Sequence, residues 1–198
     1  MNATGELGEI HRKIREELPE LAGISKPELA DKVVEAWAKS LSEGDFRAIG
    51  DLQGSGGPDV MVLKKGTQVD HLRGVTRIAM RLAEELAVLQ SDFRYDRDVL
   101  IAGALIHDVG KPFEYDPRNR GRWLKAPRAS GLPAARHTLH GYHVCMSVGL
   151  PVEVAHIAGA HSPEGDLIIR SRECTIVHHA DEAYWQILRA SGLLADVD

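Results

Sequence analysis

One apolar run constrains the fold of this chain more than any other stretch. It covers residues 100–112 and reads Leu-Ile-Ala-Gly-Ala-Leu-Ile-His-Asp-Val-Gly-Lys-Pro. The run leads into His107 and Asp108, and Gly110 and Pro112 then end the helix, because glycine tolerates a left-handed turn and proline cannot continue a helix. The sequence therefore predicts a buried helix that delivers an imidazole and a carboxylate to its C-terminal end. There both side chains can contact one metal ion, or Asp108 can bridge two.

The composition limits the classes of protein to which the chain can belong. Hydrophobic residues make up 43% and charged residues 27% of 198 residues, which suits one well-buried domain with a small appendage. A net charge of -5 and an aromatic content of 5% argue against specific nucleic-acid binding. The sequence shows no signal-like segment and no run of 18 apolar residues, so we expect a cytoplasmic protein without a membrane partner. Ten histidines, eight of them between His107 and His179, require an explanation.

Apolar periodicity predicts further helices along the chain. Their expected limits are residues 7–18, 27–43, 68–90, 137–148, 151–161 and 173–190. The glycines of residues 54–58 predict a flexible loop, and residues 60–63 form either a short strand or an extended lead-in. Residues 112–136 are expected to form an irregular basic insertion, since four prolines interrupt any helix there.

These elements suggest two parts. Residues 1–66 are expected to form an N-terminal helical extension with a Gly-rich loop, and residues 67–198 the main domain. The two N-terminal helices carry apolar stripes but no chemical motif. They serve either as a cap on the main domain or as the surface of a homodimer.

Two further candidate ligands lie on apolar helix faces. His71 is near the start of helix 68–90, on its inner face, and a buried imidazole costs free energy unless its nitrogens find partners. Asp181 shares one side of the last helix with Val177, Tyr184 and Leu188. A carboxylate in such surroundings is costly unless it is paired or bound to a metal ion, although a surface position is the plain alternative.

The histidines of helices 137–148 and 151–161 add two candidates. His137, His140 and His143 follow at intervals of three, so at most two of them can point into one site. We select His140, which shares its face with Val144. His161 lies at the end of the apolar face of the next helix.

The predicted metal ligands are all nitrogen or oxygen donors. They are His71, His107, Asp108, His140, His161 and Asp181. Such a set suits hard or borderline metals, with Fe or Mn favoured and Co, Mg or Zn as alternatives. Six side chains exceed what one ion usually takes from a protein, so we expect two divalent or trivalent metal ions with a bridging carboxylate.

Basic residues near this set are candidates for binding a small anionic substrate. Lys111 lies three residues beyond Asp108, and it either contacts a substrate phosphate or faces the helix dipole. Arg118, Arg120 and Arg122 belong to the basic insertion and are predicted to hold the substrate anion. For any single arginine, a solvated loop position is the alternative.

The ordered pattern of His71, His107-Asp108 and Asp181 resembles the HD superfamily of metal-dependent phosphohydrolases. Residues 107–111 are similar to its His-Asp-x-Gly-Lys subgroup, and His140 and His161 look like the additional histidines of its dinuclear members. The resemblance covers about residues 67–190. It departs at residues 161–164, where many dinuclear members carry a histidine doublet, and in the insertion.

The resemblance implies an all-α helical bundle and an allocation of the ligands. One metal ion would take His71, His107, Asp108 and Asp181. The other would take His140 and His161, with Asp108 as the bridge. The implied reaction is hydrolysis of a small phosphate ester or nucleotide by metal-activated water. Asp108 and Lys111 are the expected catalytic residues, with Lys111 and an insertion arginine neutralising developing charge.

Two other functions use the same ligands. Some members of the superfamily are mixed-valent di-iron oxygenases that cleave C–C or C–P bonds, and the ligand set does not separate them from hydrolases. A non-catalytic metal-binding signalling module would be favoured if a ligand were missing, and every position of the pattern is filled.

Overall fold

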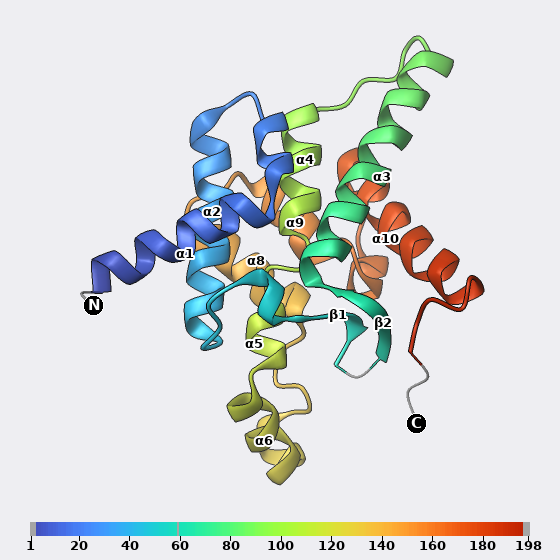
Figure 1. The fold of residues 1–198 in the computed structure, drawn as a ribbon. Helices are drawn as coiled ribbons and strands as arrows, with labels where there is room; N and C mark the ends of the chain where they lie inside the picture. The colour runs from blue at the N-terminus through green and yellow to red at the C-terminus, as the bar shows by residue number, and fades with distance from the viewer. Residues whose placement is uncertain (1–2, 59, 196–198) are drawn as a thin grey trace.

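The computed structural model of this protein describes residues 3–58 and 60–195. It is a helical body from which α5 and α6 project at one end (Figure 1). The helices are α1 (Ala3–Glu17), α2 (Pro27–Glu43), α3 (Gln68–Leu89), α4 (Arg97–Ile106), α5 (Lys111–Tyr115), α6 (Pro117–Lys125), α7 (Pro127–Ser130), α8 (His137–Ser147), α9 (Val152–Ala160) and α10 (Arg172–Ala190). Three short 3-10 helices are η1 (Pro19–Gly23), η2 (Ile49–Asp51) and η3 (Pro163–Leu167). The predicted all-α fold class is confirmed.

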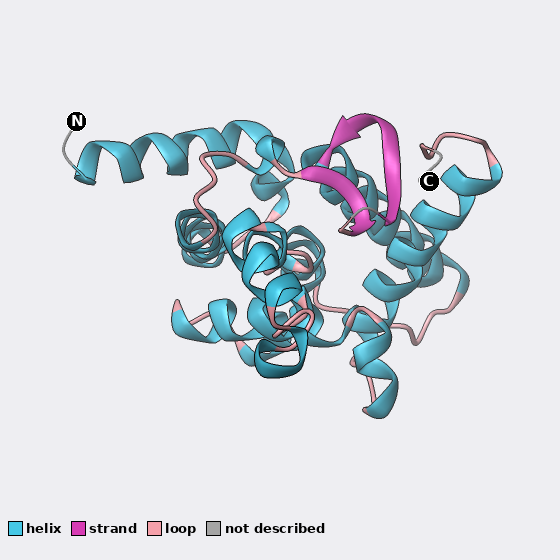
Figure 2. Ribbon diagram, turned by 90° about the horizontal axis from the view of Figure 1, so that it is seen from below, coloured by secondary structure: helices cyan, strands magenta, loops and turns pink. Residues whose placement is uncertain are grey.

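A small antiparallel hairpin accompanies the helices (Figure 2). Strand β1 (Gln53–Gly57) pairs with β2 (Val60–Thr67), with Ser55 opposite Val62. The flexible loop predicted for residues 54–58 is therefore wrong for its first four residues. Glycine is needed at position 54 for packing, because a Cβ there would lie 2.6 Å from the Leu63 side chain and 2.8 Å from a backbone oxygen of β2.

The region predicted as an irregular insertion is largely helical, since it contains α5, α6 and α7. Pro112, Pro117 and Pro127 each occupy the first or second position of one of these helices. Proline is tolerated there because the first backbone N–H groups of a helix have no partner within it. The prolines thus begin short helices where we expected them to prevent helices.

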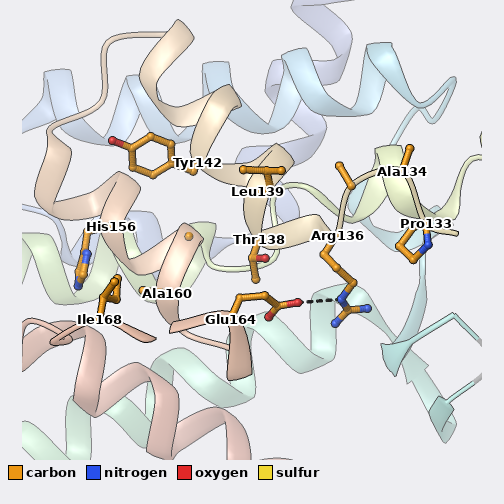
Figure 3. Close-up of a pocket in the computed structure, with 12 residues that line it drawn as sticks. Pro133, Ala134, Arg136, Thr138, Leu139, Tyr142, His156, Ala160, Glu164 and Ile168 are labelled. Atoms are coloured by element: carbon orange, nitrogen blue, oxygen red, sulfur yellow. Dashed lines mark hydrogen bonds and ion pairs between the residues drawn. The ribbon is translucent and has the colours of Figure 1, made fainter. Parts of the chain in front are cut away.

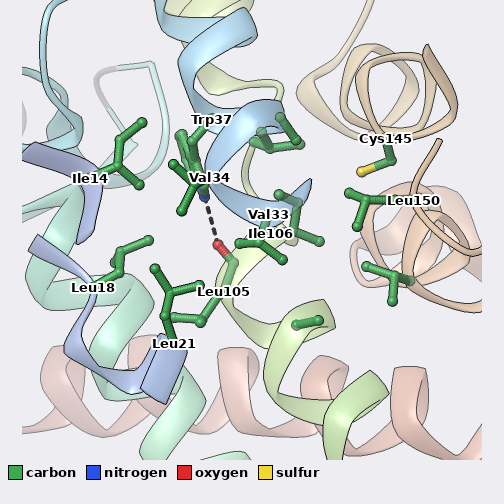
Figure 4. Close-up of a cluster of buried hydrophobic side chains, with 14 of the residues drawn as sticks. Ile14, Leu18, Leu21, Val33, Val34, Trp37, Leu105, Ile106, Cys145 and Leu150 are labelled. Carbon is green, nitrogen blue, oxygen red and sulfur yellow. Dashed lines mark hydrogen bonds between the residues drawn. The ribbon is translucent and has the colours of Figure 1, made fainter. Parts of the chain in front are cut away.

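The main hydrophobic core joins the N-terminal helices to the central helices of the chain. It packs Ile14 of α1, Leu18 directly after that helix and Trp37 of α2 against α4, α8 and α9 (Figure 4). The indole Nε1 of Trp37 donates a hydrogen bond to the carbonyl oxygen of Leu105 at 2.8 Å, one residue before the end of α4. The N-terminal helices therefore support the segment that carries His107, while the division at residue 66 stays a prediction.

A second core brings α3, α4, α9 and α10 together. Val75, Ala104, Ile157 and Val177 are fully buried in it. The helices approach closely, because a Cβ on Gly103 of α4 would lie 2.1 Å from the Cδ1 atom of Ile157. This packing brings the start of α3, the ends of α4 and α9 and the middle of α10 around one point. Among the described residues, no helix is long and apolar enough to cross a membrane.

Asp98 ties the start of α4 to the connection between η1 and α2. Its carboxylate accepts hydrogen bonds from the backbone N–H and the hydroxyl of Ser25, at 2.8 and 2.7 Å. Burial alone would raise the pKa of Asp98, but these hydrogen bonds outweigh it and hold the pKa below its ordinary value. Because the folded state then binds fewer protons, the stabilisation is complete at neutral pH and is lost as the pH falls through the lowered pKa.

We predict that Asp98→Asn lowers the free energy of unfolding at pH 7 by about 1.5 to 3 kcal/mol, the usual value for hydrogen bonds to a charged group. The difference from the wild type should shrink below about pH 3.9, the ordinary pKa of aspartate. Urea unfolding at several pH values measures both effects. Asp92→Asn, at an exposed position, is the control and should change little. A difference that is constant down to pH 2 would contradict this account.

Candidate metal centre

Histidine and aspartate side chains from five helices meet at one buried point. His71 comes from α3, Asp181 from α10 and His137 from the first position of α8. His107 and Asp108 form the turn after α4, and His161 directly follows α9. Except for Asp181, whose side chain is 17% exposed, these residues are at most 2% exposed.

The two oxygens of Asp108 face different pairs of histidines. Oδ2 lies 3.1 Å from Nε2 of His71 and 3.3 Å from Nε2 of His107. Oδ1 lies 3.4 Å from Nε2 of His137 and 3.7 Å from Nε2 of His161. Donor atoms that share one metal ion at bond lengths near 2.1 Å stand about 3 to 3.5 Å apart. The contacts of Asp108 with His71, His107 and His137 have this spacing, and the contact with His161 is slightly longer.

Hydrogen bonds orient three of the four imidazoles. Nδ1 of His107 donates to the carbonyl oxygen of Ala104 at 2.7 Å, and Nδ1 of His161 donates to that of Ala158 at 3.1 Å. Nδ1 of His137 donates to the Glu114 carboxylate at 2.8 Å. In a neutral imidazole bonded in this way, Nε2 carries a lone pair, which here points toward the Asp108 carboxylate. Facing acceptors repel each other, and a cation between them removes the repulsion.

A carboxylate oxygen of Asp181 is a second indication that this group can bind a cation. This atom, Oδ1, is buried and accepts no hydrogen bond in the structure, although Nε2 of His71 lies 3.3 Å away. Ligand atoms of His71, His107 and Asp181 lie within 4.8 Å of one another, as do those of His107, Asp108 and His161. The donor set and its spacing fit metal ions.

Lys111 neutralises Asp108 through Oδ2, the oxygen that faces His71 and His107. Its Nζ atom lies 2.7 Å from Oδ2 of Asp108 and also donates to the carbonyl oxygen of Ser55 at 2.6 Å. Gln68 completes the arrangement, because its Nε2 donates to the same Oδ2 atom at 2.7 Å and its Oε1 accepts from Lys111 at 3.2 Å. Lys111 is thus beside Asp108, as the sequence predicts, and its contact with a substrate stays a prediction.

The electrostatic environment favours the metal-binding protonation states of Asp108, His71 and His161, but it favours the protonated form of His107. Burial lowers the pKa of His71 and lowers that of His161 well below its usual range. Burial also acts to lower the pKa of His107, but the Asp108 and Asp181 carboxylates outweigh it and leave this pKa raised. For Asp108, burial is outweighed by Lys111 and His107, which hold the pKa well below its ordinary value. Asp108 is therefore ionised, and His71 and His161 are neutral.

The structure places His137, and not the predicted ligand His140, beside Asp108. Nε2 of His140 lies 3.1 Å from a Glu43 carboxylate oxygen, and its ring stacks on Phe113 with centroids 4.2 Å apart. The first turn of α8 packs directly on the turn after Asp108, since a Cβ on Gly110 would lie 2.0 Å from the His137 carbonyl oxygen. The first residue of α8 consequently faces Asp108.

The predicted substrate-binding arginines of the insertion have other partners. Nη2 of Arg118 lies 2.5 Å from the Asp116 carboxylate, and Nη2 of Arg122 donates to Asn119 at 3.3 Å. Arg120 lines a cavity of about 220 Å³ together with Glu114 and Arg136.

The sequence analysis missed two residues that orient His137. Glu114 accepts from Nδ1 of His137, and Nη1 of Arg136 donates to Glu114 at 2.7 Å. Burial acts to raise the pKa of Glu114, but His137 and Arg136 outweigh it and keep this carboxylate ionised. Spacing alone offers no signal for Glu114. The available clue to His137 was its place at the start of a helix, after Arg136 and one turn before Gly141.

A pocket lies next to this centre, because residues adjacent in the chain to two of its histidines line it. It has a volume of about 510 Å³ and lies between α8, α9 and η3 (Figure 3). Thr138 and Ala160 line it, next in the chain to His137 and His161, and an ion pair of 2.9 Å between Arg136 and Glu164 crosses it. No metal-ligand candidate lines this pocket itself.

Comparison with known proteins identifies a family that the chain matches. Residues 69–184, more than half of the chain, match the HD domain family. One curated relative, the dihydroneopterin 2',3'-cyclic phosphate phosphodiesterase of Methanocaldococcus jannaschii, is 32% identical over 123 residues, which cover 60% of this chain and 46% of the relative. The match therefore spans less than half the length of that protein. No solved structure matches the chain significantly.

The matched region begins in α3 and ends in α10, so it encloses every residue that meets at the buried centre. The resemblance seen in the sequence is thereby confirmed. We conclude that this chain belongs to the HD domain family.

Proposed function

We propose that this chain is a metal-dependent phosphohydrolase that cleaves a small phosphate ester at a dinuclear centre. The observation that carries the proposal is the position of Asp108, whose two carboxylate oxygens each face a separate pair of histidine Nε2 atoms. A carboxylate in this position suits a bridge between two ions. Membership of the HD domain family and the phosphodiesterase relative support the assignment.

The residues present would divide between two ions. His71, His107, Asp108 and Asp181 would hold the first, and Asp108, His137 and His161 the second. Nitrogen and oxygen donors without thiolates suit Fe or Mn, which we propose as the native metals, ahead of Co, Mg or Zn. When bound, such ions polarise phosphoryl oxygens and lower the pKa of coordinated water into the neutral range.

Residues of the chain itself would prepare the centre for this chemistry. Lys111 and Gln68 hold the Asp108 carboxylate in place through hydrogen bonds of 2.7 Å each. Glu114 fixes the ring of His137 through Nδ1. With two carboxylates and one ammonium group, Asp108, Asp181 and Lys111 leave a net negative charge in a buried site. That net negative charge favours the binding of cations.

The relative suggests the substrate class. Its name specifies a 2',3'-cyclic phosphate of dihydroneopterin. We propose that this chain likewise acts on a small anionic phosphodiester, with 2',3'-cyclic phosphates as the first class to test.

Activity on this class provides the first test. We expect the protein, purified without oxygen and supplied with Mn²⁺ or Fe²⁺, to open a 2',3'-cyclic nucleotide or to release nitrophenol from bis(p-nitrophenyl) phosphate. Asp108→Asn should reduce kcat/KM at least about 100-fold, the usual cost of losing one charge-stabilising group in an active site. Asp92→Asn, at an exposed position, is the control. Full turnover by Asp108→Asn would contradict the proposal, as would consumption of O₂ by an iron form that hydrolyses no phosphate ester.

Metal content tests the choice between His137 and His140. We predict that His137→Ala loses about one metal ion per chain relative to the wild type, because it removes a donor from the Oδ1 half of the centre. His140→Ala should keep the full content, since His140 contacts Glu43 and Phe113 instead of Asp108. Elemental analysis of both variants after identical reconstitution makes the measurement. The opposite result, with metal lost only from His140→Ala, would restore His140 as the ligand.

A further inference from the structure

A second group of metal-binding side chains lies on the outer face of α10. His178, His179 and Glu182 offer ligand atoms that all lie within 4.8 Å of one another. The side chains of His179 and Glu182 are 63% and 51% exposed, whereas that of His178 is 13% exposed and lies at the edge of this group nearest the protein interior. None of the three contributes to the buried centre, although Asp181 of that centre is adjacent to Glu182 in the chain.

Two separations in this outer group approach that of atoms around one ion. A carboxylate oxygen of Glu182, Oε2, lies 3.7 Å from Nε2 of His178 and 3.7 Å from Nδ1 of His179. Both distances exceed a hydrogen bond, which for N–H···O is about 2.7–3.2 Å. They are close to the separation of about 3.4 Å between ligands of a tetrahedral zinc ion with bonds near 2.1 Å. The helix itself produces this spacing, since residues three and four positions apart are neighbours on its surface.

A hydrogen bond gives His178 the orientation of a metal ligand. Its Nδ1 atom donates to the carbonyl oxygen of His161 at 2.5 Å, which leaves the lone pair of Nε2 directed toward Glu182. Metal-binding histidines regularly donate their other ring N–H to a backbone carbonyl or a carboxylate in this way. His107 and His161 of the buried centre use the same arrangement.

We propose that His178, His179 and Glu182 form a second, solvent-accessible site for one borderline divalent cation, of which Zn²⁺ is the best match. Two imidazoles and one carboxylate suit Zn²⁺, and solvent would fill the remaining coordination position. Hard cations such as Mg²⁺ prefer oxygen ligands and are not expected there.

Zinc binding to single-site variants of the full chain tests the proposal. The protein, with its buried centre loaded identically in every sample, is dialysed against rising concentrations of free Zn²⁺ and its metal content is measured. We expect the wild type to bind one more Zn²⁺ per chain than His179→Ala. Glu182→Gln should bind this ion more than tenfold more weakly, since losing even an outer partner of a ligand costs about 10–100-fold in affinity. Mg²⁺ should give no difference between wild type and variants.

A control variant and two further measurements make the result decisive. His143→Ala removes another exposed histidine and should bind zinc like the wild type. Ring ¹⁵N spectra of the wild type should show that Zn²⁺ shifts the signals of His178 and His179. His179 and Glu182 are exposed, so their replacement leaves the core intact, and thermal unfolding of the zinc-free proteins verifies this. Equal zinc content in all proteins, or zinc shifts confined to other histidines, would overturn the proposal. Neither result depends on phosphohydrolase activity.

Discussion

The buried charge of Asp108 is the constraint on which the rest of the structure depends. Transfer of an ionised carboxylate from water to a protein interior is strongly unfavourable unless the charge is paired and hydrogen-bonded. Lys111 and Gln68 supply a cation and a donor at 2.7 Å each. Lys111 is itself buried and needs the carbonyl oxygen of Ser55, at 2.6 Å. The small hairpin that carries Ser55 is therefore part of the centre and not an accessory to the helical body.

The ends of two helices explain how the histidines face inward. The last carbonyl groups of a helix have no partner within it. His107 and His161 directly follow α4 and α9, and their Nδ1 atoms donate to carbonyl oxygens three residues back. This contact satisfies an otherwise unpaired carbonyl and turns Nε2 toward Asp108. Close packing at Gly103 and Gly110 then brings the helix ends together, because side chains at these positions would collide with Ile157 and with the backbone of α8.

Several elements of this arrangement could be predicted from local sequence. The cap of α3 is one example, since Thr67 and Asp70 form reciprocal hydrogen bonds at the predicted start of that helix. Prolines were a poor guide, because Pro112, Pro117 and Pro127 lie where helices begin and the sequence pattern does not distinguish a first turn from an interior position. The glycines of β1 were equally ambiguous, because the same residues permit a flexible loop or a close approach between strands.

The sequence by itself determined the chemical identity of the donors, the helix ends at His107 and His161 and, through the ordered pattern of His71, His107-Asp108 and Asp181, the family. Those features are local or depend on order along the chain. Only the tertiary structure decided that His137 faces Asp108, that His140 contacts Glu43 and that Glu114 orients His137. Helical periodicity states which residues share a face, but the rotation of α8 about its own axis is set by packing against Gly110 and neighbouring helices. That rotation selects one histidine of three.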